Sequence, residues 1–139
     1  MDSCTLKQLL TRNDATSARF GDVCARNRLP LYRLPNQDIF VVNTLDSTQL
    51  HDGHWVLMLF DDTQNTLEFF CSLGAHPRDY GKTFTDFIKR HSNYTLVVCS
   101  RSIQDMNSDT CGNYVYLYTV LRCMGVASQE ILYAFDDVH

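Results

Sequence analysis

The sequence lacks a long apolar run, a basic excess and a secretion signal. No segment approaches the roughly 18 to 20 consecutive apolar residues that cross a bilayer, so we expect no membrane partner. The formal net charge of −4 argues against a general affinity for nucleic acid, because that affinity comes from cations that neutralise phosphates. The first residues, MDSCTLKQLL, have neither the basic start nor the apolar core of a signal peptide. We therefore expect an intracellular protein.

The six cysteines include no C-x-x-C pair, which argues against a structural zinc site. Their even number fits a disulfide framework as well as a set of free thiols. Without a secretion signal, and in a chain long enough to fold unaided, we predict reduced thiols in a reducing compartment. No metal and no other cofactor is predicted.

The 139 residues have the length of a single domain, and no linker or repeat divides residues 1–139. Apolar spacing and turn residues predict helix, strand, hairpin, helix, strand and helix in that order. The expected elements are a first helix through Leu6 and Leu10, a strand at 38–43, a hairpin at 54–71, a helix at 83–91, a strand at 94–99, a helix from 111 to about 124 and a short last helix at 129–135. This order predicts an α+β domain, a mostly antiparallel sheet flanked by helices, which we expect to be a monomer.

Cys111 stands where a polar loop meets the predicted long helix, and Gly112 follows it. A helix N-terminus offers unpaired N–H groups and a partial positive charge, and both favour a thiolate. A glycine beside the thiol leaves room for a peptide substrate. The alternative interpretation is a buried core cysteine.

His54 opens the hairpin, between Gly53 and Trp55, the only tryptophan in the chain. An imidazole at a strand end, shielded on one side by an aromatic ring, suits a general base. Gln104 lies seven residues before Cys111, and its amide could donate a hydrogen bond to an oxyanion. Alternatively, His54 is a surface histidine and Gln104 an ordinary loop residue.

Together these residues resemble the adenovirus protease (adenain) family, whose relatives include the proteases that process SUMO-like modifiers. The elements that carry the resemblance are VVNT at 41–44, Gly53-His54-Trp55, CSLG at 71–74, Gln104 and Cys111-Gly112. The family order is histidine, acid, glutamine, cysteine, the reverse of papain. The resemblance covers residues 39 to about 125 and implies an adenain-like fold, circularly permuted relative to papain.

The resemblance assigns Cys111 as the nucleophile, His54 as the base and Gln104 as an oxyanion-hole donor. The thiolate would attack a substrate carbonyl, and the resulting acyl-enzyme would then be hydrolysed. The resemblance also implies contacts between the substrate and three residues: Gly53, Trp55 and Gly112.

The acid position of the family holds Cys71 in this chain. Glu68 is three residues earlier, and an odd offset on a strand places it on the opposite face. The aspartates of the turn at 61–65 belong to the far end of the hairpin. We therefore expect a Cys–His dyad, with a water, a backbone carbonyl or Ser72 orienting His54.

The leading functional interpretation is a viral-type cysteine endopeptidase for virion maturation. The resemblance implies a polypeptide substrate, a viral structural precursor with a glycine-containing cleavage site, and a location in the virion and the host nucleus or cytoplasm. Adenovirus proteases are stimulated by DNA and by a disulfide-linked viral peptide. By this analogy DNA could activate the chain, but the acidic net charge does not support it, and Asn93 stands at the position of the linking cysteine.

Three other interpretations stay open. The chain could be a deconjugase for SUMO or ubiquitin-like modifiers, although 139 residues leave little surface for a modifier. It could be a catalytically silent module that binds peptides, for which Cys71 is the evidence. It could also be an unrelated α+β domain with accidental motif matches.

Overall fold

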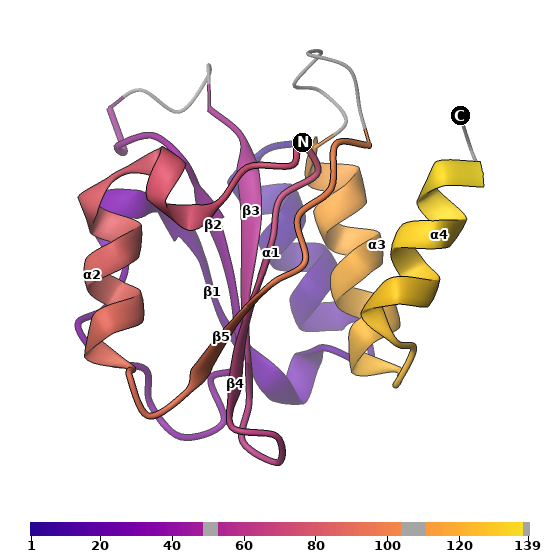
Figure 1. The fold of residues 1–139 in the computed structure, drawn as a ribbon, viewed down its shortest axis with the longest axis horizontal. Coiled ribbons are helices and arrows are strands. Elements are labelled where there is room, and N and C mark those ends of the chain that lie inside the picture. Colours follow the sequence, from indigo (N-terminus) through magenta and orange to yellow (C-terminus); the bar gives the residue numbers. More distant parts are fainter. Residues whose placement is uncertain (49–52, 104–110, 138–139) are drawn as a thin grey trace.

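The computed structural model describes residues 1–48, 53–103 and 111–137. Its elements form three layers, with a central sheet between one helix on one face and three helices on the other (Figure 1). The helices are α1 (Ser3–Arg12), α2 (Lys82–Arg90), α3 (Cys111–Cys123) and α4 (Ser128–Asp137), and the strands are β1 (Phe20–Ala25), β2 (Ile39–Asn43), β3 (Trp55–Asp61), β4 (Thr66–Phe70) and β5 (Thr95–Val98). The short 3₁₀ helices are η1 (Ser17–Arg19), η2 (Arg26–Arg28) and η4 (Pro77–Tyr80). The α+β class is confirmed.

The sheet is mixed, so the prediction of a mostly antiparallel sheet is wrong. Its order is β1-β2-β3-β4-β5, and the two outer pairs, β1–β2 and β4–β5, are parallel. Only the inner pairs, β2–β3 and β3–β4, are antiparallel. Strand β1, FGDVCA, was not predicted, because a glycine and an aspartate interrupt its apolar residues. β5 is parallel to β4 because α2 forms a crossover between them.

Strand β3 is buried on both faces, which explains its uninterrupted apolar run. Trp55, Leu57 and Leu59 pack in the cluster that holds residues of α1, α3 and α4. Val56 and Met58 pack in the cluster that includes Phe84 and Phe87 of α2. Successive β3 side chains therefore enter two separate cores, one on each side of the sheet.

Helix α3 buries residues spaced to form one face, including Cys111, Val115 and Tyr118. The helix ends where the sequence predicts, at Gly125, whose φ of 92° lies in the left-handed region that favours glycine. At the other end, Cys111 is the first helical residue. The starts of α3 and β3 and the N-terminus of the chain lie at the same end of the sheet (Figure 1). This arrangement brings Cys111, at the start of α3, and Trp55, at the start of β3, to one edge of the molecule.

Candidate active site

The sulfur of Cys111 lies next to the strand end that carries His54. The backbone N–H of Trp55 donates a hydrogen bond to Cys111 Sγ, with a nitrogen–sulfur distance of 3.4 Å. Because that nitrogen is bonded to the carbonyl carbon of His54, the sulfur lies within about 6 Å of the His54 Cα. The structure therefore brings together two residues that are 57 positions apart in the sequence.

The direction of the backbone explains why the Trp55 amide is available. Thr44 donates its N–H to the His54 carbonyl at 2.9 Å, and its hydroxyl accepts the His54 N–H at 3.1 Å. The backbone N–H and C=O of His54 therefore face β2, and those of Trp55 face the side of β4. The ladder between β3 and β4 ends at the Leu57–Phe70 pair, so Cys111 Sγ takes the Trp55 N–H beyond the last strand pair.

The His54 ring is half-buried and incompletely paired. Its Nδ1 atom is buried and has no hydrogen-bond partner among the described residues. Burial lowers the pKa of His54 below its ordinary value of 6.5. The imidazole is therefore neutral at pH 7 and can accept a proton.

Burial raises the pKa of Cys111 above the ordinary thiol value. The hydrogen bonds from the backbone amides of Trp55 and Gly112, and the positive α-amino group of Met1, act in the opposite direction but are smaller. The amides at the start of the helix thus favour the thiolate, as expected, but desolvation outweighs them in this conformation. The pair consists of a thiol and a neutral imidazole.

Cys71 is buried and faces a phenol. Its Sγ lies 3.1 Å from Tyr80 Oη, at the end of η4. Burial, and then the hydrogen bond to Cys71, raise the pKa of Tyr80. Cys71 also contributes to the raised pKa of Cys111, as the smallest of its causes, so the two thiols lie within electrostatic reach of each other. The sequence did not identify Tyr80 as a residue of the candidate site, and its contact with Cys71 in the structure is what identifies it.

No carboxylate among the described residues bonds to the His54 ring. Glu68 lies on the face of the sheet opposite Cys71, as its offset predicts, and packs against α3. There Arg122 donates a hydrogen bond of 2.9 Å to its carboxylate, and the Tyr118 hydroxyl donates another. Asp62 of the hairpin turn pairs with Arg33 at the far end of the sheet. Glu68 and Asp62 are therefore engaged elsewhere, and the Cys–His dyad without a carboxylate stays a prediction.

Gly53 is required by the close approach of Asn43. A Cβ at position 53 would lie 2.0 Å from Asn43 Oδ1, which is far below any tolerable contact. The same oxygen accepts the Leu45 N–H at 3.0 Å, and the Asn43 side chain is buried. Gly53 therefore fixes the path of the chain into His54, and the structure shows no other role for it.

Trp55 and Gly112 are both covered by the first residue of the chain. The Trp55 indole Nε1–H donates a hydrogen bond of 2.9 Å to the Met1 carbonyl. A Cβ at position 112 would lie 2.9 Å from Met1 Cβ and 3.4 Å from Trp55 Cδ1. Two of the three predicted substrate contacts thus form one surface, which a peptide segment already occupies.

Gln104, the predicted oxyanion donor, lies outside the described residues, as do residues 105–110. Within the described ranges, no group of three or more histidine, cysteine or acidic side chains could hold a metal ion. All six cysteines lie in the described ranges, and none of them forms a disulfide. Of the helices that the structure describes, none has the length and apolar character needed to cross a membrane.

Comparison with known proteins gives no family assignment. No family model matches the chain, and no curated protein matches it. The resemblance to the adenovirus proteases therefore rests on the sequence motifs alone and stays a prediction.

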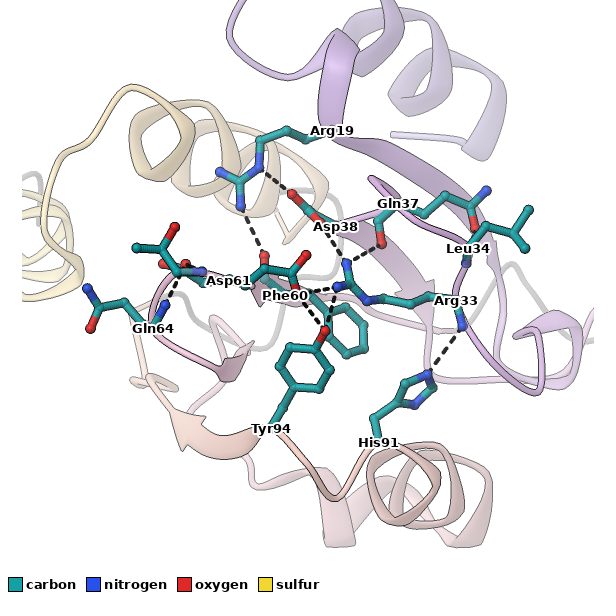
Figure 2. Close-up of polar contacts among 12 residues, drawn as sticks. Arg19, Arg33, Leu34, Gln37, Asp38, Phe60, Asp61, Gln64, His91 and Tyr94 are labelled. Atoms are coloured by element: carbon teal, nitrogen blue, oxygen red, sulfur yellow. Dashed lines mark hydrogen bonds and ion pairs between the residues drawn. The ribbon is translucent and has the colours of Figure 1, made fainter.

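A second polar cluster, which the sequence did not reveal, lies at the opposite end of β3 (Figure 2). Arg33 stacks over the Phe60 ring, with its guanidinium carbon 4.5 Å from the ring centroid. Its guanidinium donates to Asp38 at 2.6 Å, to the Tyr94 hydroxyl at 2.6 Å and to Asp62. The cluster ties the long loop between β1 and β2 to the hairpin turn and to the start of β5.

His91 belongs to the same cluster and is buried (Figure 2). Its Nε2 accepts the Arg33 backbone N–H at 3.2 Å, and its Nδ1 lies 2.7 Å from the Phe87 carbonyl. Since a carbonyl only accepts, these partners require a neutral ring with the proton on Nδ1. Burial lowers the pKa of His91, and the charges of Arg90 and Arg33 lower it further.

Proposed function

We propose that this chain is a cysteine endopeptidase with Cys111 as nucleophile and His54 as general base. The observation that carries the proposal is the contact of 3.4 Å between Cys111 Sγ and the Trp55 amide, one peptide bond from His54. His54 also carries a buried Nδ1 without a hydrogen-bond partner among the described residues, on an imidazole that is neutral at pH 7 and can accept a proton. A helix N-terminus, a thiol and a base at one strand end are the parts that thiol-based acyl transfer needs.

In the proposed reaction, proton transfer accompanies the attack, because both partners start neutral. Cys111 Sγ bonds to the substrate carbonyl carbon while His54 takes the thiol proton. The amides at the start of α3 stabilise the oxyanion, and we assign Gln104 as the second donor from its sequence position. His54 then gives its proton to the leaving amine as the C–N bond breaks. Water hydrolyses the thioester that remains on Cys111.

The adenain-like fold and the class of substrate belong to the same proposal. A helix that begins with the nucleophile, packed on a sheet whose hairpin begins with the base, supports the resemblance. We propose that the substrate is a polypeptide, a structural precursor cleaved at a glycine-containing site. This substrate class comes from the resemblance alone.

A second candidate function is a catalytically silent module that binds peptides at the same site. The observation that favours it is the contact between Cys71 and Tyr80, which fills the acid position with a thiol and a phenol in place of a carboxylate. The raised pKa of Cys111 also favours it, because a buried thiol is a weak nucleophile unless a base acts on it.

Peptide cleavage separates the two functions. The protein is incubated with capsid-type precursor peptides that contain glycine at the scissile bond, and with Gly-Gly-ended modifier fusions. Cleavage that Cys111→Ala abolishes, and that the matched control Cys4→Ala retains, supports the endopeptidase. Cys4 suits the control because its side chain is exposed on α1. Binding of the peptides without cleavage would establish the silent module, and release of the modifiers alone would establish a deconjugase.

A further inference from the structure

We propose that Trp55 and Gly112 form a subsite for one residue of an extended peptide, and that Met1 occupies this subsite and competes with substrate. The subsite, defined by the Trp55 indole and the Gly112 Cα, lies beside Cys111. The inference deepens the proposed function by naming what the site binds, and the part that concerns peptide binding holds whether or not the protein cleaves peptides.

Met1 makes the contacts that a bound peptide residue would make. Its backbone carbonyl accepts the indole N–H of Trp55 at 2.9 Å. Its side chain lies across Gly112, with Met1 Cβ only 2.9 Å from the place where a Cβ of residue 112 would stand. Met1 is 37 % exposed and Trp55 is 6 % exposed, so the segment covers the ring while remaining on the surface.

The chemistry of the two residues selects a peptide rather than another ligand. An indole N–H is a donor without acceptor capacity, so it suits a backbone carbonyl. The indole ring and the bare Gly112 backbone offer an apolar surface, which suits an apolar side chain. Glycine at position 112 permits this approach, because any Cβ there would displace the residue that lies on it.

Covalent attachment makes the segment an effective competitor. A short tether holds its end at an effective concentration on the order of millimolar, which is enough to block a site for weakly binding peptides. A peptide must displace Met1 before it can reach the subsite, and its apparent affinity falls by the fraction of protein in which the subsite is free. The contact between Met1 and Trp55 is therefore autoinhibitory in this arrangement.

The single tryptophan makes the test direct, because its emission reports on this subsite alone. All measurements use the Cys111→Ala background, which removes turnover. A trimmed protein that begins at Ser3 is released from a cleavable fusion. Because trimming also removes Asp2, the N-cap of α1, the matched control is full-length protein with Asp2→Ala, which loses the cap and keeps Met1.

The expected result is a red shift of the Trp55 emission in the trimmed protein relative to the Asp2→Ala control. Addition of a blocked tripeptide, acetyl-Met-Asp-Ser-amide, should reverse the shift in the trimmed protein and leave the control unchanged. Equal emission from the two proteins, with no response to the tripeptide in either, would overturn the proposal.

A kinetic measurement in the protein with Cys111 intact separates this inference from the proposed function. If the chain cleaves peptides, trimming should lower KM by about threefold or more at unchanged kcat, because a competitor that fills the site has been removed. A KM equal to that of the Asp2→Ala control would overturn the autoinhibitory role. If no protein cleaves but the emission responds, the subsite stands and the endopeptidase proposal fails.

Discussion

The sulfur of Cys71 and the hydroxyl of Tyr80 lie 3.1 Å apart in a buried position next to the candidate dyad. Cys71 follows β4 directly, and Tyr80 ends η4, so the contact joins the sheet to the layer of α2. The Arg26 guanidinium donates a hydrogen bond of 3.3 Å to the Tyr80 backbone carbonyl, so Tyr80 is bonded at its backbone as well as at its hydroxyl. The pair occupies the place where the resemblance expects a carboxylate.

Cys71→Asp tests whether this place is an acid position. We expect cleavage at an equal or higher rate, because a carboxylate would orient His54 and stabilise its protonated form. We also expect a loss of about 1 to 3 kcal/mol in the free energy of unfolding, because position 71 is buried and a charge is costly there. Peptide cleavage and urea unfolding are the measurements. Cys71→Ser is the control, since it keeps a partner for Tyr80. A folded Cys71→Asp protein without activity would show that the acid position lies elsewhere.

Gly53→Ala should destabilise the approach to His54. Its Cβ would stand 2.0 Å from Asn43 Oδ1, so the chain or the asparagine must move. We expect a loss of about 1 to 3 kcal/mol in unfolding free energy, typical of overpacking. Asn43→Ala removes the clashing atoms, so the double variant should lose less than the two single losses combined. Strict additivity in this cycle would contradict the steric explanation.

His91 should make the fold sensitive to mild acid. Its pKa is lowered in the folded protein, so the unfolded chain binds the proton more tightly. The stability that the neutral ring contributes is complete above about pH 6.5 and is lost as the pH falls towards the folded pKa. Protonation of Nε2 would place its new N–H against the backbone N–H of Arg33. The charges of Arg33 and Arg90 would repel the imidazolium. Asp38 and Asp62 already pair with Arg33, so they do not compensate the new charge.

Urea unfolding at pH 7.5 and pH 5.5 measures this effect. The control is His91→Gln, whose amide can accept from Arg33 and donate to the Phe87 carbonyl without titrating. We expect a smaller loss of stability at low pH in this variant than in the parent protein. His54 acts in the same direction, because burial lowers its pKa as well. An unchanged pH dependence in His91→Gln would assign the acid sensitivity to other groups.

Arg122→Met should be strongly destabilising. The substitution leaves the Glu68 carboxylate buried without its ion pair, which typically costs about 3 to 5 kcal/mol. Replacement of both residues, as Glu68→Leu with Arg122→Met, removes the uncompensated charge and should recover most of the loss. Chemical denaturation of the single and double variants checks this. A double variant as unstable as the single one would show that the cost comes from packing rather than charge.

Cys111 should be alkylated slowly at neutral pH in the absence of substrate. Burial raises its pKa and limits access of the reagent, so exposed Cys4 should react first with iodoacetamide. The rate at Cys111 should continue to rise above pH 8.5, the ordinary thiol pKa. Peptide mass spectrometry of partly labelled protein provides the order of reaction. Rapid labelling of Cys111 at pH 6 would show that a thiolate is present without substrate.

Local patterns in the sequence predicted the parts of the fold that depend on local physics. The hairpin and the end of α3 just before Gly125 both follow from residue types at fixed spacings. β1 could not be predicted, because its interrupted sequence becomes a strand only by pairing with β2. The parallel direction of the outer strands likewise depends on where distant segments pack.

The candidate site divides in the same way. Residue types and order predicted His54 and Cys111 as the dyad, and the structure places Cys111 beside the strand end that follows His54. The offset of Glu68 predicted that it lies away from the acid position, and the structure pairs it with Arg122. The raised pKa of Cys111 was not predictable, since it depends on how much water the packed helix excludes. The contact of Tyr80 with Cys71 and that of Met1 with Trp55 arise from tertiary packing and have no signal in the sequence pattern.

The mixed sheet also orders the events of folding. The β3–β4 hairpin closes across a turn of a few residues, whereas each parallel outer strand must wait for a long connection to close. We expect the hairpin to nucleate and the edges to join late, so that mutations in β1 mainly accelerate unfolding. His54 would then be in place early, and its partner sulfur would reach it only when the last layers assemble.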